Sequence, residues 1–133
     1  KTLVFAAAGP FDGYVTVFKP HEAGTDGVPY PSYRCLFPDA PPPGTVANCA
    51  EVGVLGAVVG VLGTLQAVEV LKEITGAGET LAGHLLIYDA KETRFEKVAI
   101  AWDPENALTG SRPVIKDLSI HAGAAGAVCQ PAP

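Results

Sequence analysis

Hydrophobic residues in this chain form a few short runs that glycine and proline separate. Residues 3–8 are apolar throughout, and residues 14–18 are all β-branched or aromatic, with glycine, proline and aspartate between the two runs. This pattern predicts two strands joined by a tight turn. Because residues 3–8 show no polar alternation, we expect the first strand to be buried on both faces, as in the middle of an α/β sheet.

The longest apolar run, Val52 to Leu71, predicts a central helix over about residues 50–75. Asn48 can cap its N-terminus, and Gly76 can take the left-handed conformation of a C-cap. The first half carries no charged side chain and is expected to be buried on every side. The second half has a polar face, which consists of Gln66, Glu69, Lys72 and Glu73.

A membrane span is the competing interpretation of the same run. Its uncharged part is about 17 residues, which is near the lower limit for crossing a bilayer. Gly56 and Gly60 form a small-residue pair of the kind found in packed membrane helices, but flanking basic clusters and an aromatic belt are missing. We therefore expect a buried helix and no membrane partner.

Two further segments complete the predicted elements. Residues 85–89 and 94–102 flank a short polar turn and predict a hairpin over about residues 84–102. Residues 114–120 form one more short apolar segment before a tail rich in alanine and glycine. Residues 111–133 are therefore expected to be a C-terminal extension that is partly mobile.

Proline and glycine from Pro20 to Gly44 predict a loop of about 25 residues without regular structure. Structureless loops longer than about 15 residues in compact domains are usually functional or disordered. Residues 29–38 at its centre carry aromatic side chains, Arg34 and Cys35. Such a segment favours docking on a partner, although a plain surface loop remains the alternative.

Composition narrows the function classes. The content of 48% hydrophobic and 17% charged residues excludes a charge-rich disordered chain, and 133 residues is the length of one domain. A net charge of -5 argues against nucleic-acid and acidic-membrane partners. The three cysteines, Cys35, Cys49 and Cys129, form no CxxC pair, which favours a reducing, cytoplasmic location over a disulfide framework.

Few residues suggest chemistry by themselves. No glycine-rich phosphate loop follows a strand and opens a helix, and the three histidines lack metal-ligand spacing, so neither a nucleotide site nor a metal site is expected in this chain. Cys49 is the best catalytic candidate because the N-terminus of the predicted helix would favour a thiolate there. An inert buried cysteine is the alternative, and the neighbouring Glu51 would oppose ionisation.

Several ordered stretches together closely resemble the ThiF/MoeB/HesA family, the ATP-dependent adenylyltransferases that activate ubiquitin-like sulfur-carrier proteins. They are residues 31–38, 41–44, 48–56, 63–72 and 86–90, and residues 1–18 look like the strand pair that precedes the crossover loop of that family. The match covers about residues 1–104. The resemblance implies an α/β fold: the C-terminal part of a Rossmann-like activating-enzyme fold, with a mixed sheet, a long central helix and antiparallel hairpins.

In that family the residues that bind ATP and magnesium precede the segment that begins at Lys1. The resemblance therefore implies that residues 1–110 are the C-terminal part of such a domain and that the N-terminal nucleotide-binding half, with ATP and Mg, belongs to a longer protein. It also implies that this portion alone is inactive. The family enzymes adenylate the C-terminal Gly-Gly carboxylate of a small carrier in pathways such as thiamin or molybdopterin biosynthesis.

For this portion the resemblance implies a crossover loop over about residues 20–48, a partner groove and a homodimer surface. Tyr33, Arg34 and Phe37 are the expected contacts with the sulfur carrier. Cys49 matches a family cysteine that takes part in acyl or sulfur transfer in some members and is dispensable in others. The alternative function is a non-catalytic dimerisation or binding module for a ubiquitin-like protein.

The chain departs from one family pattern. Many relatives hold zinc with a CxxC pair in the crossover loop and a second CxxC pair after the last hairpin. Here the first pair reads Ser32 and Cys35, and the second falls at Asn106 and Thr109, so three of the four ligands are missing. We therefore expect no structural zinc, and a crossover loop that has lost this staple.

Overall fold

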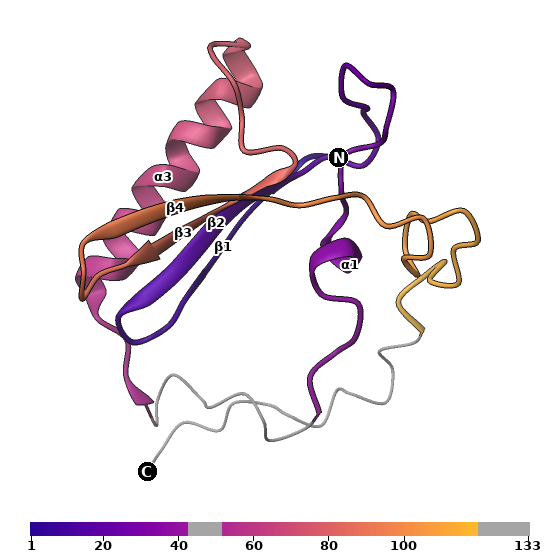
Figure 1. Ribbon diagram of the computed structural model, residues 1–133. Helices are drawn as coiled ribbons and strands as arrows, with labels where there is room; N and C mark the ends of the chain where they lie inside the picture. Colours follow the sequence, from indigo (N-terminus) through magenta and orange to yellow (C-terminus); the bar gives the residue numbers. More distant parts are fainter. Residues whose placement is uncertain (43–51, 120–133) are drawn as a thin grey trace.

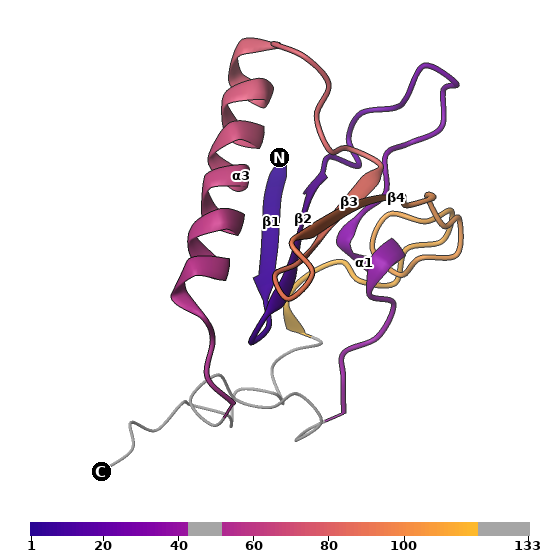
Figure 2. The ribbon, with the colours of Figure 1, turned by 60° about the vertical axis from the view of Figure 1, so that its left-hand side comes forward.

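The computed structural model describes residues 1–42 and 52–119. The elements in chain order are β1 (Leu3–Ala8), β2 (Asp12–Phe18), α1 (Tyr33–Leu36), α3 (Gly56–Thr75), β3 (His84–Asp89) and β4 (Arg94–Ala99). The four strands form one sheet in the order β1-β2-β3-β4, with every neighbouring pair antiparallel. The long helix α3 lies along one face of the sheet, and the short helix α1 lies on the other side (Figures 1 and 2).

The expected α/β class is confirmed, as are the N-terminal strand pair and the later hairpin. A mixed sheet was expected, but in the described residues the parallel pairing consists of one isolated bridge between Val17 and Ala82. The hairpin ends at Ala99, before the predicted limit of 102, and residues 114–119 form no strand. The crossover loop was expected to lack regular structure, and this prediction is wrong because it contains α1.

The prediction that the first strand is buried on both faces is also wrong. β1 is an edge strand with half-exposed side chains, and among the described residues no strand pairs with its outer edge. Its apolar run still has a physical reason, since the two faces of the strand meet different layers. Val4, Ala6 and Ala8 pack against the core beneath α3, whereas Phe5 contacts the aromatic rings of the opposite layer.

The hydrophobic core lies between the sheet and α3. Its buried members come from β2, from α3 and from the segment before β3: Val15, Val17, Val58, Leu62 and Leu81. Val15 and Val17 are fully buried because both point toward α3, whereas the residues that alternate with them on β2 point toward the other layer. Gly13 lets β2 approach α3 closely, since a Cβ atom at this position would collide with the Leu62 side chain.

Helix α3 begins later than predicted and ends where predicted. It starts at Gly56, because Gly53 takes a positive φ of 71° that interrupts the helix, while Asn48 and the rest of the predicted start lie outside the described residues. Gly76 forms the expected left-handed C-cap, and its N–H donates to the Lys72 carbonyl. No helix of the described segments is long and apolar enough to cross a membrane.

The orientation of α3 differs from the prediction. Of its residues only Val58, Leu62 and Glu69 are buried, so the first half is not covered on every side. The predicted polar face points inward. Gln66 Nε2 donates to the Val4 carbonyl at 3.2 Å, Glu69 accepts a hydrogen bond from Leu81, and Glu73 pairs with Lys19 at 3.0 Å. Specific polar partners therefore decide which side of α3 faces the sheet.

Candidate functional site

The sheet face opposite α3 carries a cluster of aromatic side chains. Phe5, Tyr14 and Phe18 project from β1 and β2, and Tyr33 and Phe37 approach them from α1 and its C-cap. Ring centroids are 5.4 Å apart for Phe5 and Tyr33, 6.1 Å for Tyr14 and Phe37, and 5.0 Å for Tyr33 and Phe37. Aromatic pairs at such distances attract one another, so this cluster fixes α1 on the sheet.

A cavity of about 720 Å³ opens beside this cluster, and we call it the aromatic cavity. Its walls bring together all three residues that the sequence suggested as partner contacts, Tyr33, Arg34 and Phe37. Phe5 and Tyr14 line it from the sheet. Three aliphatic residues of the C-terminal segment line the other side: Leu108, Ile115 and Leu118. The aromatic cavity is thus a mainly apolar groove between the crossover loop and the segment after β4.

Two polar groups shape the aromatic cavity. Arg34 Nη1 donates hydrogen bonds to the carbonyls of Phe37 at 3.3 Å and Pro38 at 3.2 Å, so its guanidinium group fastens the end of α1. Burial raises the pKa of Tyr14 above its ordinary value, and the neighbouring Tyr33 adds to this shift. Both effects favour the neutral form of the Tyr14 hydroxyl.

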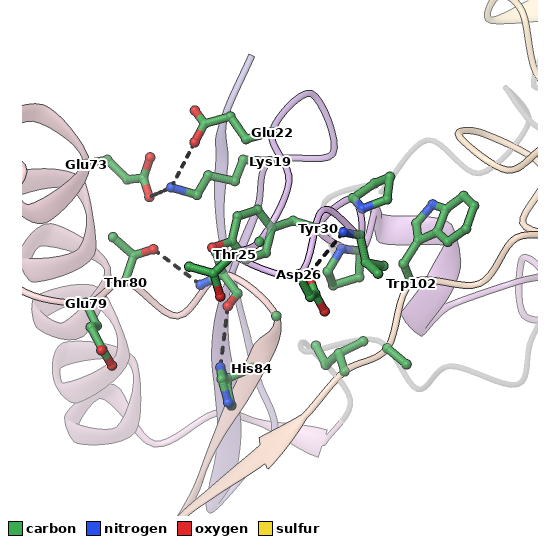
Figure 3. A pocket seen from close by; sticks show the side chains of 18 of the residues that line it. Lys19, Glu22, Thr25, Asp26, Tyr30, Glu73, Glu79, Thr80, His84 and Trp102 are labelled. Atoms are coloured by element: carbon green, nitrogen blue, oxygen red, sulfur yellow. Dashed lines mark hydrogen bonds and ion pairs between the residues drawn. The ribbon is translucent and has the colours of Figure 1, made fainter.

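A second cavity, of about 850 Å³, lies near the C-terminal end of α3, and we call it the polar cavity (Figure 3). Lys19 lies at one side between Glu73 at 3.0 Å and Glu22 at 3.4 Å, with its ammonium group 5.4 Å from the centre of the Tyr30 ring. The indole N–H of Trp102 is buried and has no hydrogen-bond partner among the described residues. Sequence reasoning missed this cavity because its residues come from segments far apart in the chain.

The remaining site predictions have different outcomes. Cys49 lies outside the described residues, so its candidate catalytic role stays a prediction. Within residues 1–42 and 52–119, no group of three or more His, Cys, Asp or Glu side chains is placed to hold a metal ion. The free thiol of Cys35 is half-buried and belongs to a hydrogen-bonded group that includes Ser32 and Asn106.

Comparison of the sequence with known proteins identifies its family. The profile of the ThiF family matches residues 1–108. The sulfur carrier protein adenylyltransferase of Thermus thermophilus is 48% identical over 118 residues, which are 89% of this chain and 43% of that protein. The adenylyltransferase and sulfurtransferase MOCS3 of Sus scrofa is 43% identical over 127 residues, covering 95% of this chain and 26% of that protein. The chain spans less than half the length of these curated relatives, and it belongs to the ThiF family.

Proposed function

We propose that this chain is the carrier-binding, C-terminal part of an ATP-dependent adenylyltransferase that activates the Gly-Gly carboxylate of a ubiquitin-like sulfur-carrier protein. Its family and the names of its relatives support an activating enzyme of this kind. ATP and Mg would bind in the N-terminal half, which precedes these residues in the family. The pathway would be of the thiamin or molybdopterin type, and the location cytoplasmic.

The aromatic cavity is the observation that carries the proposal. Its apolar walls suit the hydrophobic surface of a small carrier domain, because burying aromatic and aliphatic area is the main source of affinity in such interfaces. Tyr33 is partly exposed and Phe37 is half-buried, so both can contact a docked protein. Arg34 holds the end of α1 through backbone carbonyls, which gives this wall a fixed shape before the carrier binds.

The outer face of α3 is consistent with the proposal that an N-terminal half packs against this chain. No exposed residue of α3 carries a charge, and its exposed large side chains are Val59, Val68, Val70, Leu71 and Ile74. Large apolar side chains exposed in this number on one helix favour a site of protein contact. A Cβ atom at Gly56, Gly60 or Gly63 would meet nothing within 4 Å, so another segment can approach the helix backbone closely. Helix α3 packs against β1, and the outer edge of β1, which pairs with no strand among the described residues, offers backbone groups to a further strand.

Carrier activation in the intact protein tests the proposal. Tyr33→Ala should raise the KM for the carrier about tenfold or more in carrier-dependent ATP–pyrophosphate exchange, while the KM for ATP stays unchanged. Phe95→Ala is the matched control, because Phe95 is an exposed aromatic on β4 that does not line the aromatic cavity. Equal carrier KM values for both variants and the wild type would remove the aromatic cavity as the binding site.

Further measurements separate the enzyme from its alternatives. The 133 residues alone should catalyse no ATP–pyrophosphate exchange, and strong exchange by them would contradict the assignment of ATP to an N-terminal half. Cys49→Ala in the intact protein should reduce sulfur transfer, and unchanged transfer would make this cysteine structural. Carrier binding without any exchange by the intact protein would favour the non-catalytic binding module. Its mass in solution tests the homodimer that the resemblance implies.

A further inference from the structure

The four positions at which many relatives carry zinc-binding cysteines lie together in this structure. Ser32 Oγ is 3.6 Å from Cys35 Sγ and donates a hydrogen bond to Asn106 Oδ1 at 3.2 Å. Thr109 Oγ1 donates to the same amide oxygen, also at 3.2 Å. Direct hydrogen bonds therefore join the two segments at the positions where those relatives use zinc.

The residues at these positions do not fit zinc. Structural zinc sites in proteins use thiolates and imidazoles, and only Cys35 supplies such a ligand here. The other three side chains are two hydroxyls and a carboxamide, which are neutral and bind zinc weakly. The Asn106 amide oxygen, moreover, already accepts hydrogen bonds from both hydroxyls.

We propose that the side chains of Ser32, Cys35, Asn106 and Thr109 form a metal-free polar staple that fastens the crossover loop to the segment after β4. Asn106 lies at its centre. Its Oδ1 accepts from Ser32 Oγ, from Thr109 Oγ1 and from the backbone N–H groups of Leu108 at 3.1 Å and Thr109 at 2.7 Å. Its Nδ2 donates to the Asp103 carbonyl at 2.6 Å.

Cys35 contributes a second link between the same two segments. Its sulfur accepts hydrogen bonds from the backbone N–H of Ser32 at 3.3 Å and from that of Asp103 at 3.5 Å. Only 1% of Ser32 and 4% of Asn106 are exposed. Loss of a partner in such a buried network leaves other polar groups without hydrogen bonds, which makes the network costly to open.

The polar staple connects the two sides of the aromatic cavity. Tyr33 and Phe37 follow Ser32 in the chain, and Leu108 follows Asn106, so the staple joins the wall made by α1 to the wall made by the C-terminal segment. It therefore holds the cavity open at a fixed width without a metal ion. This structural role stands whether or not the aromatic cavity binds a sulfur carrier.

Measurement of bound metal and a variant with added cysteines test, in the intact protein, whether these four side chains lie together without a metal ion. The wild type should contain no stoichiometric zinc, and a chelator should leave its Tm unchanged. The triple variant Ser32→Cys, Asn106→Cys, Thr109→Cys, together with the native Cys35, should bind one cobalt ion and show the visible absorption of tetrahedral thiolate coordination. One zinc per wild-type chain, or a folded triple variant that binds no cobalt, would overturn the proposal.

A single substitution keeps the test decisive if the triple variant does not fold. Asn106→Ala should lower the Tm by roughly 5 °C or more, because four donors lose their shared acceptor. Glu105→Ala is the matched control, because Glu105 is next to Asn106 in the chain but its side chain is 72% exposed. The ion pair between Glu105 and Arg112 is 3.8 Å long. Equal Tm values for the two variants would show that the staple does not hold the segments together.

Discussion

Replacement of Glu69 in α3 should lower the free energy of unfolding strongly. Only 4% of Glu69 is exposed, and it is the charged member of the three buried residues of this helix, Val58, Leu62 and Glu69. Its Oε2 accepts a hydrogen bond from the buried backbone N–H of Leu81 at 2.8 Å, and its Oε1 pairs with Lys72. Lys72 also donates to the Glu79 carbonyl at 2.9 Å. One carboxylate thus joins the end of α3 to the segment that leads into β3.

The two contacts set the expected magnitude. Glu69→Ala leaves the buried N–H of Leu81 without an acceptor, which costs about 1–3 kcal/mol. Lys72 loses its partner too, but its side chain is 24% exposed and can be hydrated, so the total should stay near 3 kcal/mol, at the lower end of the range for broken buried pairs. Glu69→Gln keeps an oxygen that can accept from Leu81 and should cost only about 1 kcal/mol.

Urea and thermal unfolding followed by circular dichroism would measure these differences. The Tm should fall by roughly 10 °C for the alanine variant and roughly 3 °C for the glutamine variant. Glu92→Ala, at a glutamate whose side chain is 67% exposed, should change the Tm little. Equal losses for alanine and glutamine at position 69 would refute the argument from the Leu81 hydrogen bond, and so would an alanine variant as stable as the control.

Two further predictions concern a glycine and a lysine. Gly110 lies in a turn after β4, in which its N–H donates to the Asn106 carbonyl at 3.0 Å. Gly110→Ala should destabilise the protein by at least about 2 kcal/mol in urea unfolding, because the new Cβ atom would lie under 3.0 Å from backbone atoms of Asn106 and Pro104. A loss below about 0.5 kcal/mol would contradict this close approach. Burial opposes the charge of Lys19, but hydrogen bonds and charges of Glu73 and Glu22 outweigh it and raise the pKa of Lys19 above 10.5. The contribution of Lys19 to the free energy of unfolding is therefore complete below about pH 10.5 and is lost as the pH rises through the pKa of Lys19 in the folded state. Lys19→Met should be less stable than the wild type at neutral pH, and this difference should shrink in strongly alkaline solution; a constant difference would contradict the linkage.

The sequence was sufficient for features that depend on neighbouring residues. The strand pair, the hairpin and the Gly76 C-cap follow from local patterns and were predicted with nearly correct limits. The choice of Tyr33, Arg34 and Phe37 came from the resemblance, and the short helix α1 that brings them to one cavity was not predicted.

Features that depend on distant partners could not be predicted in this way. Gln66, Glu69 and Glu73 point inward because their partners, Val4, Leu81 and Lys19, are far away in the chain. The general rule that polar residues face solvent therefore gave the wrong side of α3. The link between Ser32 and Asn106, which are 74 residues apart, has no local signal either, and only the resemblance, which matches both positions to zinc ligands of relatives, relates them.

The uncharged outer face of α3 affects how sequence variants of this protein should be judged. In the 133 residues alone, a polar replacement of Val59, Leu71 or Ile74 removes little packing, because these side chains are 50%, 59% and 76% exposed. A mutational scan of this chain by itself would therefore score such changes as tolerated. In an intact protein whose other half rests on this face, the same changes would place polar groups in a buried interface. Variants at these positions should thus be assessed in the intact protein.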